Sequence, residues 1–269
     1  MMTKDCHELT AQDFAELKKA VKLLENQGFT RLLNNVTGKP TEKALELVPR
    51  RLKNNLDKIV NSAVTKCLHL ALNTLDKRTA RPPRNHLSTL MSGVTGGLSG
   101  FFGAPGLAAD LPVTTTLLLR SVADIARAQG EDLSCISSQL ACIEVLALGA
   151  PVEEKHVESS YYLARDGFSE FSGNAAKALS DLGADTVRAS AVNGFLGEIS
   201  ARFAVTIWQR AAVSSVPLIG ALGGAAGNAL FMHYFQDLAT GHFIVRRLER
   251  SYSKDIIRQN YMSLFASLD

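Results

Sequence analysis

Catalytic signatures are missing from this sequence of 269 residues. Neither GxxxxGK(S/T) nor a GxGxxG after a strand is present, so no phosphate-binding loop is expected. No GxSxG occurs, and none of the six histidines pairs with an obvious nucleophile. The sequence therefore indicates no reaction. We expect no catalytic residue and no cofactor, and a non-enzymatic role is favoured over an enzymatic one.

Cysteine is scarce, and a hydrophobic leader is lacking. The four cysteines form no CxxC pair, and no histidine lies at metal-ligand spacing from two of them. We expect reduced thiols in the core, with Cys135 and Cys142 on one helical face because they are seven residues apart. Residues 1–13 are polar, so no signal peptide is expected. A cytoplasmic protein is predicted, with peripheral attachment to the inner face of the cytoplasmic membrane as an extension of that prediction.

Strand signals are few, whereas helical periodicity is widespread. The clearest pattern is an apolar stripe over residues 41–76, where Pro49 is expected to start or kink the helix. Thr10 with Asp13 predicts the start of a short helix that ends near Gly28. Further helices are expected at 85–102, after a turn at 103–106 and on to 129, at 134–148, at 153–179, at 186–210, from beyond Pro217 to about 252, and at the end of the chain.

Two stretches with almost no charge dominate the chain. Residues 87–119 contain only Asp110, and residues 211–236 contain no acid, lysine or arginine. Both are long enough to span a bilayer, but their richness in glycine, serine, threonine and proline makes them marginal spans. We expect an all-α multi-helix bundle in which they form two central Gly-rich apolar helical hairpins. An N-terminal helical extension (1–40) precedes a single all-helical domain (41–269) in this prediction.

Glycines recur four residues apart in both stretches. The pairs are Gly93 with Gly97, Gly96 with Gly100, Gly220 with Gly224, and Gly223 with Gly227. This spacing leaves a smooth groove on a helix, which admits another backbone or an acyl chain. Each helical glycine costs roughly 1 kcal/mol relative to alanine, so such a run needs a compensating close contact. Tight packing in a dry core and a lipid-facing groove both stay open. The second interpretation makes lipid-binding candidates of Gly93, Gly97, Gly100, Gly220 and Gly224.

Polar residues are embedded in the first uncharged stretch and the helix that continues it. Thr116, Arg120 and Asp124 recur at four-residue steps, so they share a helical face and Arg120 can reach Asp124. Asp110 is predicted to cap a helix that begins at Pro112. Because buried charges need partners, we expect an internal network of these side chains. The network serves either to fix helix register or to bind a lipid headgroup or small ligand.

The second stretch and its continuation carry Asn228 and His242 among apolar neighbours. Both are candidates for the same polar site, and Asp237 is an alternative partner for Arg120. A third hypothesis is a hydrolase that uses Asp110, Asp124 or His242. That hypothesis requires two of these residues to converge with a nucleophile.

Basic side chains are concentrated in residues 41–86, which carry ten of them and four acids, in a chain of net charge +3. A segment of net charge +6 attracts anionic lipid or nucleic acid. Aromatic residues are not interleaved with these charges, so no nucleic-acid partner is expected. The residues predicted to contact a membrane surface are Arg50, Arg51, Lys53, Arg81 and Arg84.

One acidic cluster has the composition of a metal site: Glu153, Glu154, His156 and Glu158. Acids are also favoured at an exposed first helical turn, where they face the positive end of the helix dipole. The second interpretation is preferred, and no metal site is predicted.

Three segments resemble blocks of the EcsC protein family of bacteria. They are Ala108 to Asp132 around Asp-Leu-Pro-Val-Thr-Thr-Thr, the Ser-Tyr-Tyr-Leu-Ala-Arg that begins at Ser160, and Val216 to Phe243. Together they cover roughly residues 40 to 250. The resemblance implies a bacterial, all-helical protein, and the founding member is encoded beside components of an ABC transporter. It supplies no catalytic residues to carry over, and no motif here supports the peptidase label that some relatives carry.

These observations favour a non-enzymatic, lipid-binding or peripherally membrane-associated protein. An apolar, glycine-lined groove would hold a phospholipid or acyl chain, and the basic helix would attract anionic headgroups. The first alternative is a soluble adaptor that docks on a membrane transporter complex and exposes an apolar patch. The hydrolase of unknown substrate is the second.

Overall fold

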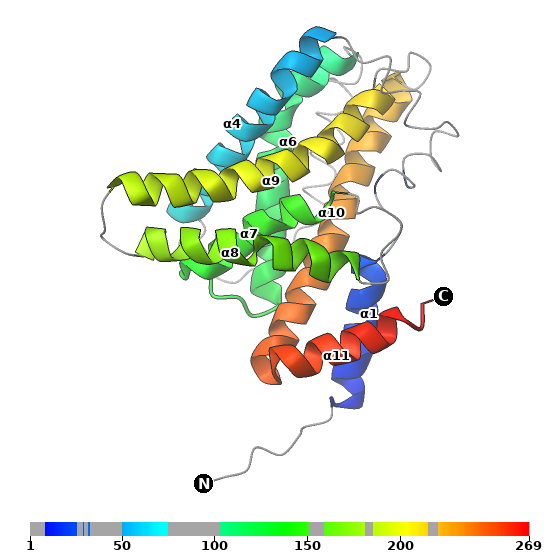
Figure 1. Cartoon of the computed structure of the whole chain (residues 1–269). Helices are drawn as coiled ribbons and strands as arrows, with labels where there is room; N and C mark the ends of the chain where they lie inside the picture. Colours follow the sequence, from blue (N-terminus) through cyan, green and yellow to red (C-terminus); the bar gives the residue numbers. More distant parts are fainter. Residues whose placement is uncertain are drawn as a thin grey trace.

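The computed structural model describes residues 9–25, 29, 32, 50–74, 103–150, 159–180, 185–214 and 220–268. In parts of the helices only the backbone is described, namely at 50–56, 71–74, 103–109, 185–188, 212–214 and 220–227. The described residues form eight α-helices and no strand, which confirms the predicted all-α bundle (Figure 1). The helices are α1 (Ala11–Leu24), α4 (Arg50–Thr74), α6 (Gly103–Ala128), α7 (Ile136–Leu148), α8 (Ser160–Ser180), α9 (Asp185–Ser214), α10 (Gly220–Ser251) and α11 (Lys254–Phe265).

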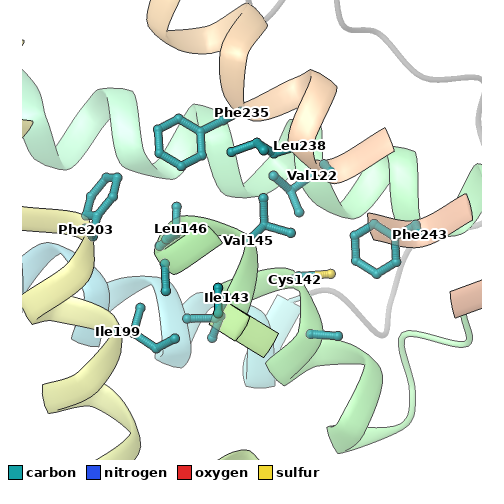
Figure 2. Close-up of a cluster of buried hydrophobic side chains, with 14 of the residues drawn as sticks. Val122, Cys142, Ile143, Val145, Leu146, Ile199, Phe203, Phe235, Leu238 and Phe243 are labelled. Carbon is teal, nitrogen blue, oxygen red and sulfur yellow. The ribbon is translucent and has the colours of Figure 1, made fainter. Parts of the chain in front are cut away.

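The shortest helix but one, α7, lies at the centre of the bundle. Its ten consecutive residues from Ser138 to Ala147 are all buried, so it has no solvent-facing side along that length. A helix that is apolar all round must be surrounded by others. Figure 2 shows side chains of α6, α9 and α10 closing around it, among them Val122, Phe203 and Phe235. Burial on every face therefore places α7 at the centre of the bundle.

The other helices form a shell in which sequence-distant segments touch. The helices α8 and α9 lie side by side, and α4 packs against both α6 and α9 (Figure 1). At the other end of the molecule α1 and α11 pack against each other and against α10. The predicted stripe on α4 is confirmed where side chains are described: Ala63 and Cys67 are buried, and Ile59 and Leu70 are half-buried against the core. Val60, Val64 and Leu68 are buried beside it and were not part of the prediction. Pro49 lies outside the described residues, so the helix start or kink predicted there stays a prediction.

Helix ends are set by local chemistry that the sequence shows in part. Thr10 is the N-cap of α1, and its hydroxyl accepts a hydrogen bond from the Asp13 backbone N–H at 3.1 Å, which confirms the predicted start. Ser253 caps α11 in the same way through the Ile256 backbone N–H. After α6, Gly130 adopts a positive φ of 77°, and the Glu131 N–H reaches back to the Ala126 carbonyl. This reversal brings Glu131 towards α10.

Two expectations about local structure are wrong. The turn expected at 103–106 is the first turn of α6, because the run of small residues continues into the helix instead of breaking it. Cys135 does not share a helical face with Cys142, since it is the exposed N-cap residue of α7, whereas Cys67 and Cys142 are buried as predicted. Cys6 and the helix expected at 85–102 lie outside the described residues.

The α1 helix contributes to the same hydrophobic core as the later helices, through Leu17, Val21 and Leu24. The division of the chain at residue 40 stays a prediction. Within the described ranges, none of the helices combines the length and apolar character needed to cross a membrane.

Candidate functional site

An open groove of about 610 Å³ runs between α4 and α9. Its volume lies in the range of small-molecule sites, which is about 300–1,000 Å³. The α9 wall is made largely of small and apolar side chains that recur every three or four residues along one helical face. The lining residues are Asp57, Lys58, Asn61, Gly197, Ser200, Ala201, Ala204, Val205 and Trp208.

Small residues on α9 keep this groove open. A Cβ atom placed on Gly197 would meet no atom of the described residues within 4 Å, so there is room for a side chain to begin here. Ala201 is exposed and Val205 is 41% exposed, although both are apolar. The chain thus leaves apolar surface uncovered along one face of α9. A smooth helix face was also predicted at the spaced glycines of residues 93–100 and 220–227, and that prediction stays open because the structure describes no side-chain surroundings there.

The α4 side of the groove is polar. Trp208 Nε1 donates a hydrogen bond to Asp57 Oδ1 at 3.4 Å, and Ser200 Oγ donates to Asn61 Oδ1 at 3.1 Å. Both bonds join α9 to α4 and hold the two helices at a fixed separation. Lys58 lies beside Asp57 at the exposed edge. The groove therefore has one apolar wall and one edge with charges of both signs.

Asp110 is buried inside α6 and does not cap a helix, so that prediction is wrong. Because α6 begins at Gly103, Asp110 is in its second turn, and Pro112 lies in the helix interior. Its carboxylate accepts from Thr114 Oγ1 at 2.7 Å and from Arg210 Nη2 of α9 at 2.9 Å. The Arg210 guanidinium also lies over the Phe231 ring. The result is a buried ion pair that ties α6 to α9, a structural role rather than an open site.

The three residues predicted to share a face of α6 have separate surroundings. Asp124 pairs with Arg127 at 3.0 Å, one turn further on, whereas Arg120 is exposed. The expected pairing of Arg120 with Asp124 is therefore wrong, because Arg127 offers the closer partner at i+3. Thr116 Oγ1 donates to the Pro112 carbonyl at 2.8 Å, which satisfies its hydroxyl within the helix. These residues form no common binding site.

His242 lies in a second buried network, between α10 and α8. Its Nδ1 is 3.0 Å from the Tyr161 hydroxyl, and Arg165 Nη1 donates to the same hydroxyl at 3.3 Å. Arg165 is held in turn by both carboxylate oxygens of Glu249 at 2.6 Å each. Asn228 is fully buried on α10 but is not among these contacts. The predicted polar residues are thus distributed between separate clusters.

Glu25 joins three distant segments and was not predicted as a functional residue. Its carboxylate accepts hydrogen bonds from the hydroxyls of Ser159, Ser160 and Tyr261. It also accepts from the Ser160 and Tyr161 backbone N–H groups, at 3.2 and 3.4 Å, and so caps the N-terminus of α8. The partners lie at least 134 residues away in sequence. No local sequence signal reports such a contact.

A third cluster surrounds Glu131. Arg246, Arg250 and Ser138 all donate to its carboxylate. Burial alone would raise the pKa of Glu131, but the hydrogen bonds from Arg246 and Ser138 outweigh it and the pKa is lowered. Glu131 therefore stays ionised and fixes the end of α6 to α10.

We expect acid to destabilise this protein through His242. Burial is the main cause that depresses its pKa, and the charges of Arg246 and Arg165 add to it. The unfolded chain takes up a proton near pH 6.5 whereas the folded state does not, so stability present above that pH is lost as the pH falls. The expected loss is about 2 kcal/mol between pH 7 and pH 5. Urea unfolding at both pH values measures it, and His242→Gln is expected to remove this part of the pH dependence. Equal pH dependences in the two proteins would contradict the assignment.

Several predicted residues cannot be placed in a site. Gly93, Gly97, Gly100, Arg81 and Arg84 lie outside the described residues, as does the acidic cluster at 153–158. The backbone of Gly220 and Gly224 is helical in α10, and that of Arg50, Arg51 and Lys53 is helical in α4, but their side chains are not described. Within the described part of the chain, no group of three or more His, Cys, Asp or Glu side chains could hold a metal ion.

A model of the EcsC protein family matches residues 11–248. The chain belongs to the EcsC family. The three blocks that resembled this family in sequence all fall within the match. No curated protein and no solved structure matches the chain.

The EcsC region contains the groove and both ends of two long-range contacts, Asp110 with Arg210 and Tyr161 with His242. The matched region begins at the first residue of α1, and Glu25 is the residue that directly follows this helix. Glu249 follows directly after its end, and Tyr261 lies thirteen residues beyond it. The EcsC match therefore contains all residues that line the groove and every described helix except α11 and the last residues of α10.

Proposed function

We propose that this protein is a non-enzymatic lipid-binding protein that associates peripherally with membranes and holds an acyl chain in the groove between α4 and α9. The observation that carries the proposal is the open groove itself, with its wall of small and apolar side chains. Burial of an acyl chain there would remove apolar surface from water on both partners, at about 25 cal/mol per Å². On the protein, the acyl chain would bury the side chains of Ala201 and Val205, which are exposed.

Charge supports the same proposal. Arg50, Arg51 and Lys53 precede Lys58 on α4, so the helix that forms one side of the groove is also the basic one. Basic residues near an anionic membrane surface contribute about 1 kcal/mol each to attraction. Helix α4 would then both attract the protein to an anionic bilayer and help to bind the acyl chain of a lipid.

The hydrolase hypothesis gains no support from the geometry. It required two of Asp110, Asp124 and His242 to converge. These residues instead bind Arg210, Arg127 and Tyr161, respectively. The adaptor hypothesis is an alternative outcome of the test below.

Trp208 offers a direct test because it is the only tryptophan of the chain and lines the groove. We expect a monomeric single-chain phospholipid to shift its fluorescence to shorter wavelength in a saturable way, and the protein to float with vesicles of phosphatidylglycerol. Gly197→Leu places a side chain in the empty space and is expected to weaken lipid binding at least about tenfold, since that corresponds to only 1.4 kcal/mol.

Gly173→Leu is the matched control for this test. Gly173 is also an exposed helical glycine with no atom within 4 Å of an added Cβ, but it lies on α8 and does not line the groove. It is expected to bind lipid like the wild type. If neither a fluorescence change nor flotation occurs, the lipid proposal fails. Recovery of a membrane protein complex in detergent without lipid binding would then favour the adaptor.

A further inference from the structure

The edge of the groove carries one charge of each sign. Asp57 and Lys58 are neighbours in α4, both are exposed, and both line the groove. Their charges cancel at this edge, unlike the strongly basic composition of the segment as a whole. A purely anionic headgroup would meet Lys58 favourably and Asp57 unfavourably. The local electrostatics therefore differ from those expected of a simple anion site.

Asp57 and Trp208 together form an environment suited to an ammonium group. Among the described residues, the carboxylate accepts one long hydrogen bond, from Trp208 Nε1 at 3.4 Å, and an ionised carboxylate has room for about four. A cation close to an indole ring is also attracted by the ring electrons. Both groups project from opposite sides of the groove, one from α4 and one from α9. An ammonium that binds the free lone pairs of the Asp57 carboxylate and lies over the face of the Trp208 ring would contact both, and it would leave the bond from Trp208 Nε1 in place.

Lys58 is suited to bind the phosphate of the same lipid headgroup. Its ammonium group carries three N–H donors and no acceptor, so it suits a phosphate oxygen. An ammonium and a phosphate are separated by a two-carbon linker in a zwitterionic phospholipid headgroup. The acyl chain of the same molecule would lie along Ala201, Ala204 and Val205, which share the groove with the charged edge.

We propose that the groove selects a phospholipid with a zwitterionic headgroup, its ammonium at Asp57 and Trp208 and its phosphate at Lys58. The inference rests on the proposed lipid-binding function and specifies its ligand class. The basic residues at the start of α4 act on the membrane surface, whereas this edge acts on the single molecule that enters the groove. Phosphoethanolamine and phosphocholine share the required chemistry. A primary ammonium would bind Asp57 through hydrogen bonds, and a quaternary one would rely on the Trp208 ring.

Isothermal titration calorimetry with three lysophospholipids of the same acyl chain tests the inference. The headgroups are phosphoethanolamine, phosphocholine and phosphoglycerol, each used below its micelle concentration in physiological salt. Because the three lipids share the same acyl chain, differences in their affinities measure the contribution of the headgroup. At least one zwitterionic lipid is expected to bind about tenfold more tightly than the glycerol lipid, which is the combined effect of one exposed ion pair and one cation–π contact.

Asp57→Asn is the decisive variant, since it keeps an oxygen for Trp208 Nε1 while it removes the charge. It is expected to abolish the preference without loss of binding to the glycerol lipid. Lys58→Gln is expected to weaken all three lipids, because the phosphate is common to them. Asp255→Asn is the control, because Asp255 is an exposed acid on α11, far from the groove (Figure 1).

The outcomes separate this inference from the function on which it rests. Equal affinities, a preference for the glycerol lipid, or an unchanged preference in Asp57→Asn would overturn the headgroup assignment and leave lipid binding intact. Failure of all three lipids to bind would overturn both.

Discussion

Replacement of Asp110 by asparagine is expected to lower the free energy of unfolding by about 3–5 kcal/mol. The side chains of Asp110 and Arg210 are only 3% and 5% exposed, so the substitution leaves a guanidinium buried without its counter-charge. A lost partner in a buried pair is costly because the remaining ion cannot recover its hydration. Urea unfolding followed by far-UV circular dichroism gives the free energy.

Two further variants show whether the buried charge is the cause. The double variant Asp110→Leu with Arg210→Met removes both charges and is expected to be more stable than Asp110→Asn. Asp124→Asn breaks a more exposed pair with Arg127 and is expected to cost less than about 1 kcal/mol. An Asp110→Asn protein as stable as Asp124→Asn would show that the buried pair is not the tie between α6 and α9 that we describe.

Gly241→Val is expected to cost about 3 kcal/mol, at the upper end of the cost of overpacking a core. A Cβ at Gly241 would lie 2.6 Å from Leu24 Cγ and 3.1 Å from the Ala20 carbonyl oxygen. Leu24 could rotate, but the Ala20 backbone cannot move without shifting α1 from α10. Glycine is required here by the close approach of two helices. Thermal and urea unfolding of the variant measure the effect.

Gly173→Val is the matched control for Gly241→Val. The same side chain is added at an exposed helical position where a Cβ meets no atom within 4 Å. The expected change is within about 0.5 kcal/mol, as for most surface substitutions. Similar losses at both positions would show that the α1–α10 contact is not the cause of the loss at Gly241, since helix propensity favours valine over glycine.

Hydrophobic periodicity predicted the helices well because it depends only on residues that are close together in the sequence. The stripe through Ile59, Ala63 and Cys67 requires only that positions three and four apart share a face. Thr10 before α1 is likewise a local signal. Element type and approximate bounds were therefore accessible from the sequence.

The site was less accessible because its contacts join residues far apart in sequence. Asp110 was assigned to a cap because Pro112 resembles a helix start, but its partner is Arg210, 100 residues away. The wall of the groove is built from Gly197, Ala201 and Ala204 on α9, whereas the structure describes no side-chain surroundings for the spaced glycines that predicted a groove, so that prediction stays open. Small residues of several kinds make a smooth face, so a search for glycine alone overlooks it. Only the packing of α4 against α9 shows which small-residue face stays uncovered.

The contacts of Glu25 have a consequence for how the folded chain fluctuates. One carboxylate holds the end of α1, the first turn of α8 and Tyr261 of α11. If α1 detaches, α8 loses its cap and α11 loses a hydrogen bond at the same moment. These segments therefore belong to one cooperative unit for local opening, in the sense measured by native-state amide hydrogen exchange. The groove is lined by α4 and α9, which lie at the other end of the molecule from α1 and α11 (Figure 1), so none of its lining residues belongs to the two helices that open and close.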